Sequence, residues 1–259
     1  MKRVLFVSDL HCGHWSGLTH PSWQIKGERG GPWAKRAMLQ RKFWAEWRRL
    51  LRDLAPIDVC VVAGDCVDGR GKKSGGVELL TADVDEQGDM AKRALGLVPA
   101  KQFAFVFGTP YHTGENEDQE QHIADFFGAP IKSHLFCEVE GVTFDVKHKI
   151  GGSHVPHGRF TAAAREALWN LVWSTRRDGQ PRADVIVRGH VHYYAYCGRA
   201  DWLSVTLPCL QCWTRYGARQ CSGDIDWGVW FADCENGRVL RWQGVTKQLR
   251  AAASTLVAL

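Results

Sequence analysis

Hydrophobic positions in the first half of the chain alternate between short continuous apolar runs and segments with helical spacing. The short runs lie at 4–7, 59–63 and 103–107 and are rich in β-branched and aromatic residues, which predicts buried strands. Segments 33–54 and 85–97, which lie between them, are predicted helices. The first helix would turn one apolar face toward the core through Leu39, Phe43, Trp47, Leu50 and Leu54. The order is therefore strand, helix, strand, helix, strand.

The second half of the chain predicts shorter strands and two more helices. Segments 135–139 and 142–147 flank Glu140-Gly141, a turn typical of a β-hairpin. The predicted helices span 115–127 and 160–177. The later helix carries on one face Ala164, Leu168, Leu171 and Val172, and further strands are predicted at 185–187, 203–207, 227–232 and 239–242. Strands in both halves with helices between them predict an α/β fold of two mixed sheets, face to face and flanked by helices.

Length, composition and cysteine content narrow the class of protein. The 259 residues, 45% of them apolar, fit one domain spanning 1–259. No run approaches the roughly 18 apolar residues that a membrane span needs. The first residues of the sequence include too few apolar ones for a signal peptide. Nine cysteines, an odd number, favour reduced thiols over a disulfide framework. We expect a cytoplasmic protein that is not bound to a membrane and has no obligate protein partner.

Carboxylates and imidazoles recur where the predicted strands end. The first strand is followed by Asp9-Leu-His11, and the second by Gly64-Asp65-Cys-Val-Asp68-Gly69. The third is followed by His112, and the strand at 185–187 by Gly189-His190-Val-His192. Because parallel strands place their carboxyl ends at one edge of a sheet, these side chains predict a site built at that edge.

These motifs, in this order and together with His148 at the end of the strand at 142–147, resemble those of the calcineurin-like metallophosphoesterases. The resemblance covers roughly residues 4–192. It implies a four-layer sandwich and hydrolysis of phosphate esters with two divalent metal ions. Two cations can screen the negative oxygens of the ester and bind both the attacking and the leaving oxygen.

The resemblance also implies a role for each residue of the motifs. The first ion would be held by Asp9, His11 and His192, the second by His148 and His190, and Asp65 would bridge the two. A water between the ions would be acidified toward hydroxide. Asp68 would orient a ligand. We expect manganese, with iron, zinc or nickel as alternatives, because His and carboxylate ligands suit all four metals.

Two of these assignments leave alternatives open. His154 and His157 lie near His148, and we favour His148 because it ends a strand. The third motif reads Gly108-Thr-Pro-Tyr-His112, where most relatives have Gly-Asn-His. Thr109 could supply an oxygen in place of the Asn, His112 could enter the metal shell, or His112 could act as general acid while water completes the shell. We predict the general acid. The form Gly-Thr-x-x-His resembles a branch of phage and bacterial members.

The remaining motif positions bear on the substrate. Gly69 stands where protein phosphatases of the family have an Arg, which argues against a protein substrate, and Arg70 becomes a candidate phosphate contact. Loops 14–32 and 209–227 mix aromatic rings with cations, as stacking on a base requires. We therefore predict a phosphodiesterase acting on nucleotides or nucleic acid. The alternatives are a phosphomonoesterase, a catalytically silent scaffold that binds a partner, and a nucleic-acid-binding module with structural metals.

Overall fold

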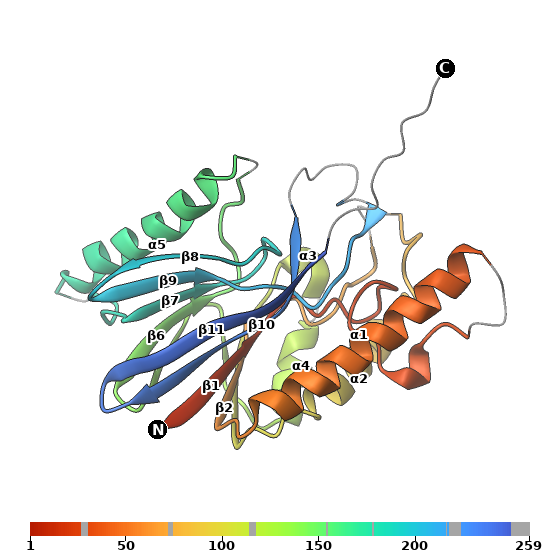
Figure 1. The fold of residues 1–259 in the computed structure, drawn as a ribbon, viewed down its shortest axis with the longest axis horizontal. Helices are drawn as coiled ribbons and strands as arrows, with labels where there is room; N and C mark the ends of the chain where they lie inside the picture. Colours follow the sequence, from red (N-terminus) through yellow and green to blue (C-terminus); the bar gives the residue numbers. More distant parts are fainter. Residues whose placement is uncertain are drawn as a thin grey trace.

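A six-stranded mixed sheet forms one half of the protein (Figure 1). The computed structural model describes residues 1–26, 31–71, 75–113, 118–153, 155–177, 179–215, 217 and 224–249. The sheet has the order β11-β10-β1-β2-β3-β4. Its strands are β1 (Lys2–Val7), β2 (Val59–Val62), β3 (Gln102–Val106), β4 (Ile131–Lys132), β10 (Ile225–Glu235) and β11 (Arg238–Leu249). Strands β1 to β4 run parallel, so their carboxyl ends share one edge, and β10 and β11 are antiparallel additions.

The second sheet has five strands in the order β5-β6-β7-β9-β8. They are β5 (Leu135–Val139), β6 (Val142–Lys147), β7 (Val185–Arg188), β8 (Ala195–Arg199) and β9 (Trp202–Thr206). Strands β6, β7 and β9 are parallel, whereas β5 and β8 pair antiparallel at the two edges. The predicted hairpin joins β5 to β6, and both Glu140 and Gly141 have the positive φ that a tight hairpin turn needs.

The two sheets pack face to face over a shared apolar core. One inner face contributes Phe6 and Val61, and the other contributes Phe144 and Val187. The ring centroids of Phe6 and Phe144 lie 5.2 Å apart, so aromatic side chains of the two sheets touch directly. This core fixes the distance and the angle between the sheets, and with them the relative position of the strand ends.

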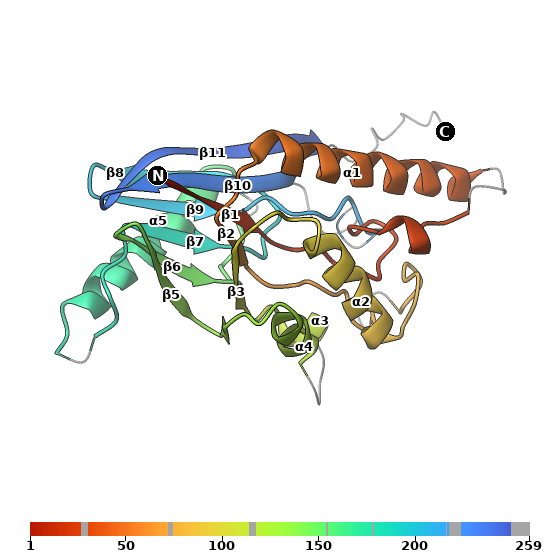
Figure 2. The same ribbon diagram turned by 90° about the horizontal axis from the view of Figure 1, so that it is seen from below.

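Helices cover the outer faces of both sheets (Figure 2). The six-stranded sheet is covered by α1 (Pro32–Leu54), α2 (Val84–Leu95) and α4 (Gln119–Phe126), which share a second apolar core with it. Trp47 of α1 is fully buried there and donates from its indole N–H to Ala94 O of α2 at 3.1 Å. The five-stranded sheet is covered by α5 (Gly158–Ser174). The four layers confirm the predicted fold class.

Helix α5 faces the sheet with its small residues. Ala162, Ala163 and Ala167 are buried, whereas the apolar face identified in the sequence points outward. Leu168 is 63% exposed and Leu171 is 44% exposed. Small side chains let the helix lie close to β7, β8 and β9, and this leaves the large apolar residues of the helix in solvent.

Several elements differ from those predicted. The short α3 (Pro110–Thr113), the 3-10 turn at Pro21–Trp23 and strands β4 and β8 were not predicted, and β10 and β11 extend beyond 227–232 and 239–242. Helix α4 begins at Gln119, where the Asp118 side chain accepts a hydrogen bond from Glu120 N. Residues 114–117 and 250–259 lie outside the described residues. None of the helices described has the length and apolar character needed to cross a membrane.

Candidate metal centre

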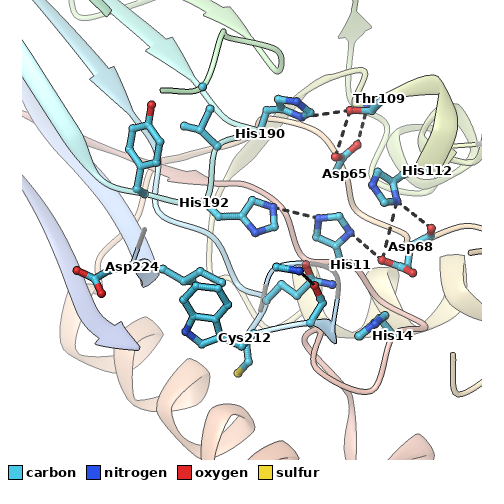
Figure 3. Close-up of a pocket in the computed structure, with 18 of the residues that line it drawn as sticks. His11, His14, Asp65, Asp68, Thr109, His112, His190, His192, Cys212 and Asp224 are labelled. Carbon is cyan, nitrogen blue, oxygen red and sulfur yellow. Dashed lines mark hydrogen bonds and ion pairs between the residues drawn. The ribbon is translucent and has the colours of Figure 1, made fainter. Parts of the chain in front are cut away.

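The strand ends of both sheets meet at one site (Figure 3). Asp9 and His11 follow β1, Asp65 and Asp68 follow β2, and His112 lies on α3 after β3. The second sheet brings His148 after β6, and His190 and His192 after β7. Hydrogen bonds join the sheets here, two of them to backbone groups. His190 N donates to Asp9 Oδ2 at 3.0 Å, and the His148 ring nitrogen Nδ1 lies 2.7 Å from Ala63 O.

Three overlapping groups of side chains place their ligand atoms within 4.8 Å of one another. The groups are Asp9, His11 and His192; Asp65, His148 and His190; and His11, Asp65 and His112. The sequence motifs are thus brought together in the two sets expected from the resemblance. Asp65 belongs to two groups, and so does His11, which makes the three groups one continuous cluster.

The backbone at this cluster adopts conformations that few residues tolerate. Asp9, His11, Asp65, His190 and His192 all have positive φ, between 45° and 73°. Asp and His enter this left-handed region more readily than most residues, but each such position still costs free energy that the surrounding fold must offset. Strain at five of the six candidate ligands, all but His148, indicates that the fold holds these side chains toward one point.

The two ring nitrogens of His11 have different partners. Nδ1 lies 3.0 Å from Asp68 Oδ1, an acceptor, so Nδ1 carries the proton. Nε2 therefore presents a lone pair, and it faces Nε2 of His192 at 3.3 Å. Asp9 Oδ1 lies 3.1 Å from that same His192 nitrogen. Lone pairs converging with a carboxylate oxygen form the donor set that a divalent cation requires.

His148 provides a test of whether the residues fit a metal ion. Its Nδ1 donates to Ala63 O, so in the neutral imidazole Nε2 carries the lone pair. That Nε2 is buried and makes no hydrogen bond to a described residue, although Asp65 Oδ2 lies 3.0 Å away in an ion-pair arrangement. A buried polar atom without a hydrogen bond is costly. A cation shared with Asp65 would satisfy it, so the residues fit a metal ion.

Thr109 occupies the position of the Asn that the third motif lacks. Its backbone N–H donates to Asp65 Oδ1 at 2.6 Å, and its hydroxyl lies 3.4 Å from both Asp65 Oδ2 and His190 Nδ1. The loop depends on Gly108, because a Cβ there would meet the backbone and carboxylate of Asp65. Thr109 therefore fixes the orientation of the shared carboxylate, while its hydroxyl reaches the second group.

His112 is held by a main-chain contact. Its Nδ1 lies 2.8 Å from Asp68 O and donates to it, which leaves Nε2 free to face the cluster. Its ring packs edge-on against His11, with centroids 4.6 Å apart. Burial and the charge of His11 lower the pKa of His112. The geometry thus allows both roles expected from the sequence, metal ligand and proton donor.

Charge coupling within the cluster is strong. Burial is the largest influence on the pKa of His148 and would lower it, but the charge and hydrogen bond of Asp65 together with the charge of Asp9 outweigh burial and raise the pKa to about 9. Burial is also the largest influence on the pKa of Asp65 and would raise it, but the neighbouring imidazoles, His148 foremost, together outweigh it and lower the pKa to about 2. The carboxylates thus favour positive charge on their neighbours. Metal ions would replace the protons that the imidazoles otherwise hold.

Glu120 is a buried site residue that the motifs did not indicate. Its carboxylate accepts the N–H of Cys66 at 2.9 Å and also the N–H of Gly108. It thereby ties together the loops after β2 and β3. Burial raises the pKa of Glu120 to about 7, with the charge of Asp65 adding to the effect. No sequence signal marks this residue, because it lies in the first turn of α4 and belongs to none of the motifs.

A cavity of about 500 Å³ opens onto the cluster. Its walls include His14, Trp213 and Thr214. Parts of the two loops predicted to contact a base, 14–32 and 209–227, therefore lie at the site. Tyr216 and Arg219 of those loops, like His154, lie outside the described residues. Arg70 is exposed and does not line the cavity, so its predicted phosphate contact stays a prediction. A cation from elsewhere, Arg159, does line it.

No family model matches the sequence, and no curated protein matches it. Among solved structures, an archaeal phosphodiesterase is similar at 13% identity and a TM-score of 0.48, over 95% of this chain and 99% of that one. Vps29 from Entamoeba histolytica complexed with zinc is similar at 13% identity and a TM-score of 0.45, over 94% and 98%. Vps29 from Chaetomium thermophilum is similar at 10% identity and a TM-score of 0.45, over 96% and 97%. Likeness at this level transfers no function, so the site itself must indicate the chemistry.

Proposed function

We propose that this chain is a two-metal hydrolase of phosphate esters, acting on phosphodiesters of nucleotides or nucleic acid. The observation that carries the proposal is the position of Asp65, which belongs to two of the three ligand groups. A carboxylate has two oxygens and can serve two cations at once. Because of its sequence motifs, we propose that the chain belongs to the calcineurin-like metallophosphoesterase superfamily. Its third motif favours the branch with Gly-Thr-x-x-His.

The ligand groups divide the residues between two ions. Asp9, His11 and His192 would hold the first ion, and Asp65, His148 and His190 the second. Asp65 also groups with His11, a member of the first set, and we propose that it contacts both ions. Divalent cations bound there supply positive charge that screens the ester oxygens and makes a nearby water more acidic. Manganese is the metal we expect, with iron, zinc or nickel as alternatives.

The other side chains orient these ligands and handle protons. Asp68 holds the Nδ1 proton of His11 and thereby keeps Nε2 available as a ligand. His112, fixed through Nδ1, would hold a proton at Nε2 and donate it to the leaving oxygen. Thr109 and Glu120 fix the two loops against which the shared carboxylate rests.

One observation favours a different role for His112. The group formed by His11, Asp65 and His112 is compact enough for a metal ion, and the lowered pKa of His112 favours the neutral imidazole that a metal binds. In that alternative His112 replaces the missing Asn as a ligand. The overall reaction would be the same, but the leaving oxygen would take its proton from water.

Metal-dependent turnover of two matched substrates tests the proposal. Bis(4-nitrophenyl) phosphate is a diester and 4-nitrophenyl phosphate a monoester with the same leaving group. Each would be assayed with manganese, iron, zinc, nickel and no added metal after chelation. We expect turnover to require a divalent metal and kcat/KM to be higher for the diester. Preference for the monoester would favour a phosphatase, and no turnover with any metal would favour a silent scaffold.

A further inference from the structure

Arg159 brings a positive charge into the wall of the cavity from the first turn of α5. Its guanidinium carbon lies 4.3 Å from the ring centroid of Tyr193, the residue that follows His192. Its Nε is buried without a hydrogen bond to any described residue. Within the part of the chain that the structure describes, no carboxylate forms an ion pair with it. Arg159 thus lines the same cavity as the candidate metal ligands and has an N–H donor without a partner among the described residues.

The acidic groups near Arg159 have other partners. Asp224 also lines the cavity, and it accepts a hydrogen bond from Gln248 Nε2 at 2.8 Å. Asp226 accepts the backbone N–H of Tyr194 at 2.7 Å. A guanidinium that stacks on an aromatic ring keeps its in-plane N–H groups free for an oxyanion. The first turn of a helix favours negative charge as well. These features together favour an anion at Arg159.

His112 and Arg159 both line the cavity but lie on different helices. His112 lies on α3, beside Asp68, whereas Arg159 lies on α5, and both views of the ribbon place these helices apart (Figures 1 and 2). In the proposed reaction the leaving oxygen lies beside His112. The other ester substituent of a diester, the one that stays on phosphorus, would then extend toward Arg159. A monoester has no such substituent.

We propose that Arg159 binds an anionic group on the retained substituent, so that the favoured substrates are phosphodiesters with a second phosphate. Short oligonucleotides with a terminal phosphate have this chemistry. The inference rests on the proposed function and narrows its substrate class. The role of Arg159 is to hold the second phosphate by charge-assisted hydrogen bonds, which a planar guanidinium makes in pairs.

Matched substrates test the role of Arg159 during turnover. They are a thymidine dinucleotide without a terminal phosphate, the same dinucleotide phosphorylated at its 5′ or its 3′ end, and bis(4-nitrophenyl) phosphate. Arg159→Ala should lower kcat/KM for the preferred phosphorylated dinucleotide about 10 to 100-fold, mainly through KM. It should leave the unphosphorylated dinucleotide and bis(4-nitrophenyl) phosphate unchanged, and Arg159→Lys should recover part of the loss. Arg165→Ala, on the exposed side of α5, is the matched control and should change nothing.

Binding to the full chain stripped of metal tests the same contact without catalysis. Calorimetry would compare adenosine 3′,5′-bisphosphate with adenosine 5′-monophosphate. We expect the wild type to prefer the bisphosphate and Arg159→Ala to lose that preference, whereas Arg165→Ala keeps it. Equal affinities of wild type and Arg159→Ala, or an equal loss on every substrate, would overturn the inference. Turnover of bis(4-nitrophenyl) phosphate by the wild type, with no effect of Arg159→Ala on the phosphorylated dinucleotides, would refute this inference alone, and the absence of all turnover would refute the proposed function.

Discussion

Asp68 accepts a hydrogen bond from His11, with 3.0 Å between Oδ1 and Nδ1. Asp68 itself belongs to none of the three ligand groups, so it would act on a bound metal through His11. Asp68→Ala should weaken metal binding about 10 to 100-fold, as the loss of such a contact to a ligand does elsewhere. Asp68→Asn, which keeps an oxygen acceptor, should lose less. Metal affinity measured by competition with a chelator decides this, and an unchanged affinity of Asp68→Ala would contradict the role.

His148 and His157 provide a comparison between two neighbouring imidazoles. His148 is buried against Asp65, whereas His157 is exposed at the start of α5. His148→Ala should deplete one of two metal ions, because it removes a ligand from the second group. His157→Ala and His154→Ala should keep the metal content of the wild type. Elemental analysis of the purified variants measures the content, and loss of metal in His154→Ala instead would reassign the ligand.

The variant His112→Ala distinguishes between the two roles considered for His112. If His112 is the general acid, His112→Ala should slow hydrolysis of nucleotide diesters about 100 to 10,000-fold, because the alkoxide leaving group needs a proton. Activated nitrophenyl esters and the metal content would be spared. If His112 is the ligand that replaces the missing Asn, both substrate types should slow together and metal should be lost. Both rates and the metal content are measured on one preparation of the variant.

Glu120 should make the stability of the metal-stripped protein depend on pH. Its folded pKa is raised from 4.5 to about 7, chiefly by burial. The stabilisation from the bound proton is therefore complete below about pH 4.5 and is lost as the pH rises to about 7. Relative to Glu120→Gln, the free energy of unfolding of the wild type should fall by about 3 kcal/mol across that window. Denaturant unfolding of both proteins at several pH values measures the difference, and a constant difference would contradict the buried, unpaired carboxyl.

The sequence predicts the clustering of the Asp and His side chains better than it predicts their surroundings. Asp9, Asp65 and His190 follow strands whose apolar pattern is unmistakable, and parallel strands must place such residues at one edge. Glu120 and Arg159 lie inside helices, where nothing local distinguishes them from solvated charges. Their roles depend on which loop or cavity the helix faces, and that is a matter of tertiary packing.

Helix α5 shows the same limit for predicting the fold from the sequence. Periodicity identifies an apolar face with Leu168 and Leu171, but it does not say which face packs. The buried face is the one with Ala163 and Ala167, because small residues allow a close approach to the second sheet. Strand β8 was missed for a related reason. It is an edge strand with exposed positions, and its pattern is not apolar enough to predict it.

Asp65 is the residue on which the two-metal account depends, and its substitution is the most direct test. Asp65→Asn keeps the shape of the side chain but removes the charge shared by two ligand groups. We predict a folded protein that has lost most of its metal and whose turnover of bis(4-nitrophenyl) phosphate falls about 100-fold or more. Metal content per chain and turnover are measured on the same sample, beside the wild type with two ions per chain. Two tightly held ions and normal turnover in Asp65→Asn would contradict the account.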